Sequence, residues 1–144
     1  MKRIILMAGV LALAAAGVAS AAGSGTKINL RQTALGKLLA NPKGRTIYTF
    51  TKDKPNTDVC MKIKSCTSIW PPVTTKGKPV AGPGIQKSKL GTIKLPKGTL
   101  QVTYFGHPLY TYSGDFRPGQ TDYVGVPMFG GKWFGETAAG KAVK

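Results

Sequence analysis

Tyr48-Thr49-Phe50-Thr51-Lys52-Asp53 and Tyr110-Thr111-Tyr112-Ser113-Gly114-Asp115 are two copies of one pattern. Each reads tyrosine, any residue, an aromatic residue, any two residues, aspartate. A tryptophan follows each copy at a similar distance, Trp70 after the first and Trp133 after the second. This repetition predicts that a duplicated unit builds the fold, and two copies are too few for a solenoid or a propeller.

The sequence around the motifs predicts short β-strands. Ten prolines and nineteen glycines separate short runs of β-branched and aromatic residues. Apolar and more polar side chains alternate over residues 99–105, a turn follows at residues 106–108, and the strand resumes to residue 112. This pattern predicts a β-hairpin. Residues 37–50 predict a second hairpin, with a turn at residues 41–44, although residues 33–39 are also compatible with a short helix.

These features predict a mainly β protein, a small antiparallel β domain built from two pseudo-symmetric hairpin repeats with one disulfide. We expect a signal peptide at residues 1–21 and a single domain at residues 22–144. The expected parts of that domain are repeat one at about 33–73, a basic connection at about 74–97, repeat two at about 98–136 and a flexible tail at 137–144.

The first residues have the pattern of an export signal. Lys2 and Arg3 precede an apolar run of 15 residues at positions 4–18, shorter than the roughly 20 residues that span a bilayer. Ala19-Ser20-Ala21 then supplies the small residues that signal peptidase requires. Cleavage after Ala21 would leave 144 − 21 = 123 residues, with no transmembrane segment. An uncleaved anchor is the alternative.

Cys60 and Cys66 are the only cysteines. Export would take them into an oxidising compartment, so we expect a disulfide. Closing a ring of about seven residues stabilises a fold by about 2 kcal/mol. A redox-active pair is the alternative because Lys62 and Lys64, which lie between the cysteines, would lower a thiol pKa.

The chain is strongly basic, with 21 Lys and Arg against 5 Asp and Glu. No acidic residue lies between Asp58 and Asp115, a stretch that holds eight lysines. Such a surface attracts anionic polymers of the cell envelope or lipid headgroups, whereas nucleic acid is not an expected physiological partner of an exported protein. A solvated surface that only maintains solubility is the alternative. The candidate anion-binding residues are Lys62, Lys64, Lys76, Lys78, Lys87, Lys89, Lys94 and Lys97.

The motif side chains are expected to be structural. Alternate residues of a strand share a face, so the two aromatic residues of each copy should pack together. The aspartates should cap backbone amides in Asx turns just beyond the strands. The residues concerned are Tyr48, Phe50, Asp53, Trp70, Tyr110, Tyr112, Asp115 and Trp133. The alternative is that the hydroxyls and carboxylates meet at a pseudo-twofold axis and bind a cation or a small ligand.

Catalytic patterns are lacking. His107 is the only histidine and lies in a predicted turn. One histidine and two paired cysteines do not make a typical zinc site, and no phosphate-binding glycine loop occurs. We therefore predict a non-enzymatic protein with no catalytic residues, metal or cofactor. A small envelope enzyme or redox accessory that uses the motif tyrosines and aspartates is one alternative, and a carrier of a small or hydrophobic ligand is another.

Three segments resemble a family of secreted bacterial repeat proteins, many predicted to be lipoproteins, whose signature is the Tyr-x-aromatic-x-x-Asp motif. They are residues 44–50, residues 66–73 with Cys66-Thr67-Ser68-Ile69-Trp70-Pro71-Pro72-Val73, and residues 101–110. The resemblance implies a periplasmic or secreted location and the fold rather than an activity, because the family is largely of unknown function. An association of relatives with alkane utilisation agrees with the carrier alternative. The chain departs from the family in having no lipid-acceptor cysteine, and residues 123–131 lack the family's Gly-Gln-Gly pattern.

Overall fold

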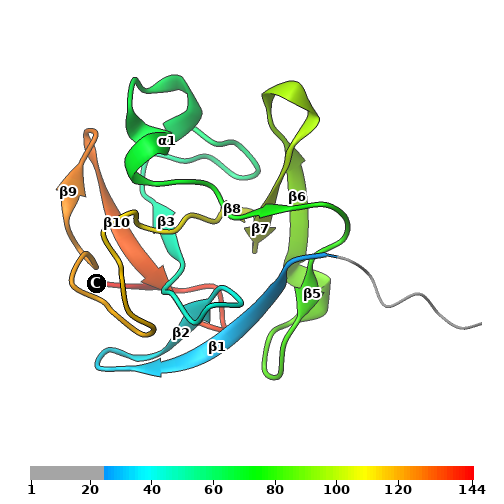
Figure 1. Ribbon diagram of the computed structural model, residues 1–144, viewed down its shortest axis with the longest axis vertical. Coiled ribbons are helices and arrows are strands. Elements are labelled where there is room, and N and C mark those ends of the chain that lie inside the picture. Colours follow the sequence, from blue (N-terminus) through cyan, green and yellow to red (C-terminus); the bar gives the residue numbers. More distant parts are fainter. Residues whose placement is uncertain (1–24) are drawn as a thin grey trace, which may run out of the picture.

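The computed structural model describes residues 25–144, which form three small sheets (Figure 1). The predicted signal peptide, residues 1–21, lies outside the described residues. In the first sheet β1 (Lys27–Thr33) pairs with β2 (Gly36–Ala40) and with β5 (Val80–Ala81). The second joins β3 (Tyr48–Phe50), β10 (Gly131–Glu136), β11 (Ala142–Val143) and β9 (Pro127–Met128). The third joins β4 (Thr74–Thr75), β7 (Leu100–Tyr104), β6 (Leu90–Lys94) and β8 (His107–Pro108).

Short helical turns occupy the connections. The helix α1 (Cys66–Ile69) and the 3₁₀ turn η1 (Cys60–Lys62) form the loop that the Cys60–Cys66 disulfide closes. Two more 3₁₀ turns, η2 (Lys87–Lys89) and η3 (Pro96–Gly98), flank β6. Both cysteines are fully buried. The predicted fold class, mainly β with antiparallel sheets, two repeats and one disulfide, is confirmed.

The two repeats use equivalent hairpins. The β1–β2 hairpin of the first repeat corresponds to the β6–β7 hairpin of the second, because Leu90 follows Ile28 by the same 62 residues (90 − 28) that separate Tyr110 from Tyr48 (110 − 48). After each hairpin the chain turns back on its second strand, as Ile47 N–H donates to Leu39 O and Leu109 N–H donates to Val102 O. Both repeats therefore contain a two-stranded hairpin ahead of the motif tyrosine.

The short helix considered for residues 33–39 is wrong, because these residues form the end of β1, the hairpin turn at residues 34–35 and most of β2. Gly36 has a φ of +97°, which side-chain-bearing residues rarely adopt. The Thr33 hydroxyl accepts from the Leu35 amide at 3.1 Å and donates to Gly36 O at 2.7 Å. These bonds close a tight turn and stop a helical continuation.

Residues 74–97, which we expected to be a basic connection, contribute strands to two sheets. β4 and β6 pair with the two edges of β7, and β5 pairs in parallel with β1. Ile85, in the same segment, is buried in the core. Its side chain and those strands make this segment part of the fold, while its lysines face solvent.

Residues 137–144, which we expected to be a flexible tail, contain β11, which pairs with Gly135 and Glu136. Just before it, Ala138 O accepts a 2.7 Å hydrogen bond from the Tyr104 hydroxyl. That hydroxyl also accepts from the Gln86 amide at 3.1 Å. The tail is therefore joined to the sheet and to a buried side chain of β7.

The core has two parts. An aliphatic cluster lies between the two equivalent hairpins and includes Ile28, Leu39, Val102 and Leu109. An aromatic cluster lies between β3, β10 and the disulfide loop, and it is made of Tyr48, Phe50, Cys60, Cys66, Trp70, Tyr110 and Trp133. The motif aromatic residues thus lie in the aromatic cluster, to which both repeats contribute.

We expect Tyr104→Phe to lower the free energy of unfolding by about 1–2 kcal/mol, because it leaves the Gln86 amide and Ala138 carbonyl without a buried partner. In a chain that ends after Glu136 the same substitution should cost less, since the Ala138 partner is absent. Urea unfolding of the four proteins in this double-mutant cycle measures the coupling. An equal cost in both backgrounds would show that the Tyr104–Ala138 bond contributes nothing.

Candidate functional site

The two motif copies meet at one backbone pair. Tyr48 and Tyr110 form an antiparallel bridge in which Tyr48 N–H donates to Tyr110 O at 2.8 Å and Tyr110 N–H donates to Tyr48 O at 3.0 Å. Equivalent positions of the two repeats therefore face each other, and a pseudo-twofold relation passes between them. Both tyrosines are fully buried.

The tyrosine hydroxyls bond to the carboxylates of the opposite copy. Tyr48 Oη donates to Asp115 Oδ2 at 2.8 Å, and Tyr110 Oη donates to Asp53 Oδ2 at 2.7 Å. The other oxygen of Asp53 accepts from the Val59 amide at 2.7 Å. Val59 lies six residues along the chain, so this bond spans a loop and is not the Asx turn that was expected. Asp115 Oδ1 is buried and has no hydrogen-bond partner.

Each tryptophan also packs against an aromatic residue of the opposite motif copy. Trp133 lies opposite Phe50 in the β3–β10 register, and their rings stack at 4.2 Å. Trp70 packs against Tyr112 with ring centroids 4.6 Å apart. The two tryptophans stack on each other at 4.0 Å with an interplanar angle of 1°. The motif side chains therefore form one continuous aromatic column rather than two separate sites.

The electrostatics of the motif favour a structural role. Burial raises the pKa of Asp53 and of Asp115 to about 6, although each tyrosine hydrogen bond opposes the shift. Burial also raises the pKa of both tyrosines, so their hydroxyls remain protonated donors. Each hydroxyl already donates its hydrogen bond to a motif carboxylate. Within residues 25–144, no group of three or more His, Cys, Asp or Glu side chains is placed to hold a metal ion.

A second polar feature lies beside the motif. His107 Nδ1 is 2.8 Å and 3.0 Å from the two carboxylate oxygens of Glu136, which is fully buried. This bond raises the pKa of His107, and burial raises the pKa of Glu136. The imidazole lines a cavity of about 200 Å³ together with Phe50, Asp53 and Phe134.

Sequence reasoning missed Glu136. It is the only glutamate of the chain and follows the apolar run around Trp133 and Phe134. An acidic residue in such a strand is rarely buried unless it is paired. The place of Glu136 in an apolar strand therefore indicates that it has a partner. The sequence does not indicate which residue that is, because His107 comes from a different sheet.

The eight predicted anion-binding lysines are all exposed, but they do not form one cluster. Lys62 and Lys64 belong to the disulfide loop. Lys89 Nζ lies 5.2 Å from the centroid of the Phe105 ring. Lys94 lies in the β6–β7 hairpin, near the turn that holds Lys97. Lys76, Lys78, Lys87 and Lys97 line two surface depressions.

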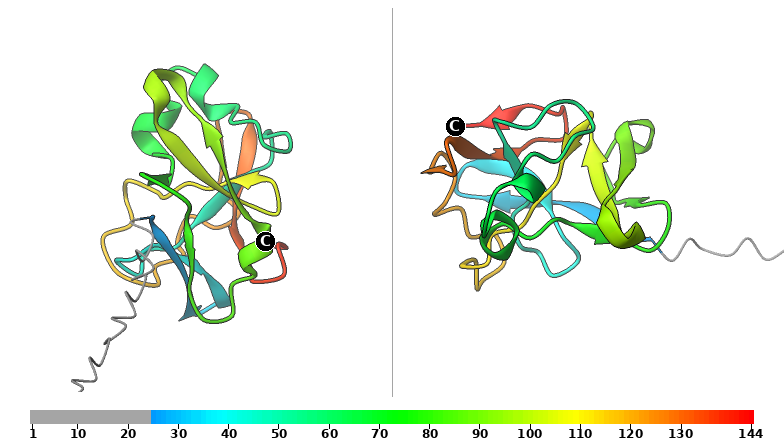
Figure 2. Two further views of the ribbon diagram at one scale, coloured as in Figure 1. Left: turned by 90° about the vertical axis from the view of Figure 1, so that its right-hand side faces the viewer. Right: turned by 90° about the horizontal axis from the view of Figure 1, so that it is seen from above.

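These four lysines border two adjacent depressions, which we call the lysine grooves. The first has a volume of about 660 Å³ and is lined by Lys76, Lys97 and several threonines. The second has a volume of about 750 Å³ and is lined by Lys78 and Lys87. Leu100 lines both grooves. They lie on the side of the molecule that carries β5 and β6, which is turned towards the viewer on the left of Figure 2.

Comparison with known proteins places the chain among secreted repeats. The family model described as a secreted repeat of unknown function matches residues 30–74 and 91–135, one match for each repeat. The search of curated proteins and the search of solved structures each found no match. In the part of the chain that the structure describes, no helix has the length and apolarity needed to span a membrane.

We expect the free energy of unfolding to rise as the pH falls from about 7 to about 4. The folded pKa of Asp53 and of Asp115, about 6, exceeds the ordinary value of 3.8. The folded state therefore binds more protons in this window, and stability is lost as the pH rises through 6. The raised pKa of His107 acts in the same direction.

Urea unfolding at several pH values measures this dependence. Asp115→Asn should flatten it because the variant has no proton to exchange at that position. Asp122→Asn, which removes an exposed charge that helps to raise the pKa of Asp115, should flatten it less. A wild-type protein that becomes less stable between pH 7 and pH 5 would contradict the burial argument.

Proposed function

This chain belongs to the family of secreted repeats of unknown function, and on that basis we propose that it is an exported, non-enzymatic protein that binds an anionic component of the cell envelope through the lysine grooves. The anionic component is a polymer or a lipid headgroup. The observation that carries the proposal is the meeting of four lysines from separate segments at two neighbouring grooves.

The geometry brings together cations that are distant in sequence. Lys76 follows β4 and Lys97 lies in η3, yet both line the first groove. Lys78 precedes β5 and Lys87 lies in η2, yet both line the second. Grooves lined by charge of one sign concentrate ligands of the opposite sign. The arrangement therefore supports recognition at a defined place rather than attraction by net charge alone.

The lysines of the grooves have no internal counterion. Among residues 25–144 the one salt bridge is between His107 and Glu136, so none involves a lysine of the grooves. No acidic residue lies between Asp58 and Asp115. The ammonium groups are therefore available to an external anion.

The motif geometry supports a binding role over the enzymatic alternative. The tyrosine hydroxyls that would be reactive groups are buried and bonded to the carboxylates of Asp115, which is buried, and of Asp53, which is half-buried. The disulfide is buried in the aromatic cluster, which favours a structural role over redox exchange. The export pattern of residues 1–21 and the disulfide support an envelope location.

We expect replacement of Lys76, Lys78, Lys87 and Lys97 by Gln to abolish retention on immobilised heparin at about 0.15 M salt, where the wild-type protein is retained. Binding to vesicles that contain anionic lipid should fall with it. A lysine at such a surface contributes about 1 kcal/mol. Loss of all four should therefore weaken vesicle binding at least about tenfold more than a control that removes equal charge elsewhere.

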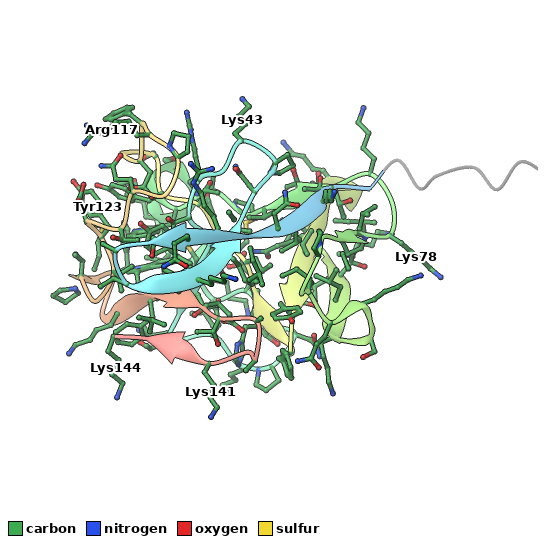
Figure 3. All side chains as sticks on the ribbon, turned by 90° about the horizontal axis from the view of Figure 1, so that it is seen from below. Lys43, Lys78, Arg117, Tyr123, Lys141 and Lys144 are labelled. Atoms are coloured by element: carbon green, nitrogen blue, oxygen red, sulfur yellow. A yellow bond between two sulfur atoms is a disulfide. The ribbon has the colours of Figure 1, made fainter. Side chains whose placement is uncertain are left out.

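The control replaces Lys37, Lys43, Lys132 and Lys144 by Gln. All four are exposed and none lines a lysine groove. Figure 3 shows Lys43 and Lys144 far from Lys78 on the molecule. Equal losses for the two quadruple variants would show that net charge alone drives binding and would refute the assignment of the grooves.

A further inference from the structure

The second lysine groove has an apolar floor. Leu90 and Leu100 line it from neighbouring strands, β6 and β7, and Pro79 lines it from the segment that precedes β5. All three side chains are only half-buried, so part of their apolar surface faces water in the groove. Leu90 also packs against the aliphatic core cluster, which keeps the floor rigid. An apolar ligand would gain free energy by covering this surface.

Cations stand at the margin of the same groove. Lys78 and Lys87 line it and are exposed, and Ser88 and Thr92 add hydroxyl groups. Its volume of about 750 Å³ is within the roughly 300–1,000 Å³ typical of small-molecule sites. A polysaccharide would satisfy the lysines but would leave the leucines facing polar groups. The groove combines two chemistries, and a ligand that satisfies both must carry an anionic group and a hydrocarbon chain.

Building on the proposed function, we infer that the groove binds a single-chain lipid with a phosphate headgroup, with the phosphate between Lys78 and Lys87 and the chain over Leu90 and Leu100. Two ammonium groups match a phosphate monoester, which carries between one and two negative charges near neutral pH. A fatty acid would bring only one charge. The first groove shares Leu100 with the second and is otherwise lined mainly by threonines, lysines and glycine. It therefore offers space next to the end of the bound chain but little further apolar surface for that chain to cover.

The test is a series of alkyl phosphates with 4, 6, 8 and 10 carbons, titrated below their micelle concentrations into the processed, disulfide-bonded protein by calorimetry. The Kd should fall about two- to fourfold for each added methylene and level off when the chain exceeds the groove. Inorganic phosphate should bind far more weakly than any member of the series. A Kd that does not depend on chain length would overturn the inference.

Thr92→Trp should remove the chain-length dependence, because the exposed Thr92 lines the groove and an indole would cover its floor. Ser88→Trp, on η2, tests the same blockage from another element if Thr92→Trp does not fold. Gln32→Trp places an equally large side chain on exposed β1, outside both grooves, and should leave the dependence unchanged. A dependence that survives both groove variants would show that the chain binds elsewhere.

The combined results separate this inference from the proposed function. Heparin retention that depends on the groove lysines, without chain-length dependence, would support the proposed function and overturn the lipid inference. Failure of both assays would overturn both. Tighter binding of a fatty acid than of the alkyl phosphate of equal chain length would overturn the assignment of the headgroup.

Discussion

The crossed hydrogen bonds from Tyr48 to Asp115 and from Tyr110 to Asp53 are the constraint on which the rest of the structure depends. Asp115 is buried and Asp53 is half-buried, and each accepts from the hydroxyl of the other repeat because a carboxylate removed from water without a partner is costly. Neither repeat supplies the hydrogen-bond partner for its own motif tyrosine and aspartate. The backbone bridge between the two tyrosines and the stacked tryptophans then form around this exchange, so the halves are interlocked rather than placed side by side.

The same exchange shapes the electrostatics of the surface. Asp58, Asp115 and Glu136 are buried and Asp53 is half-buried, which leaves Asp122 as the exposed one of the five acidic residues. The lysines, by contrast, face solvent. The fold therefore uses its few carboxylates internally and presents a surface that is even more basic than the formal net charge of +16 indicates. This separation of charge leaves the lysine grooves free of competing anions.

Local patterns predicted some elements correctly and failed where distant segments decide the structure. The alternation at residues 99–105 is a property of one strand, and β7 forms there. The segment around Gly36 lacks a decisive local pattern, and its turn depends on a bond from Thr33 and on pairing with β1. The basic segment and the tail contain short strands that no local pattern predicted, because these strands exist only through partners elsewhere in the chain. Glu136 was missed for the same reason, since His107 gives it a role.

The sequence by itself determined the duplication, the disulfide pair, the β class and the excess of lysine, because each is written in residue identity or spacing. Only the tertiary structure decided that the motif copies exchange partners, since nothing local distinguishes a tyrosine that bonds within its own repeat from one that bonds across. It also placed Lys76, Lys78, Lys87 and Lys97, four of the eight candidates, along the two grooves. That selection depends on which turns lie beside which sheet edge, a property of the packed chain rather than of any segment.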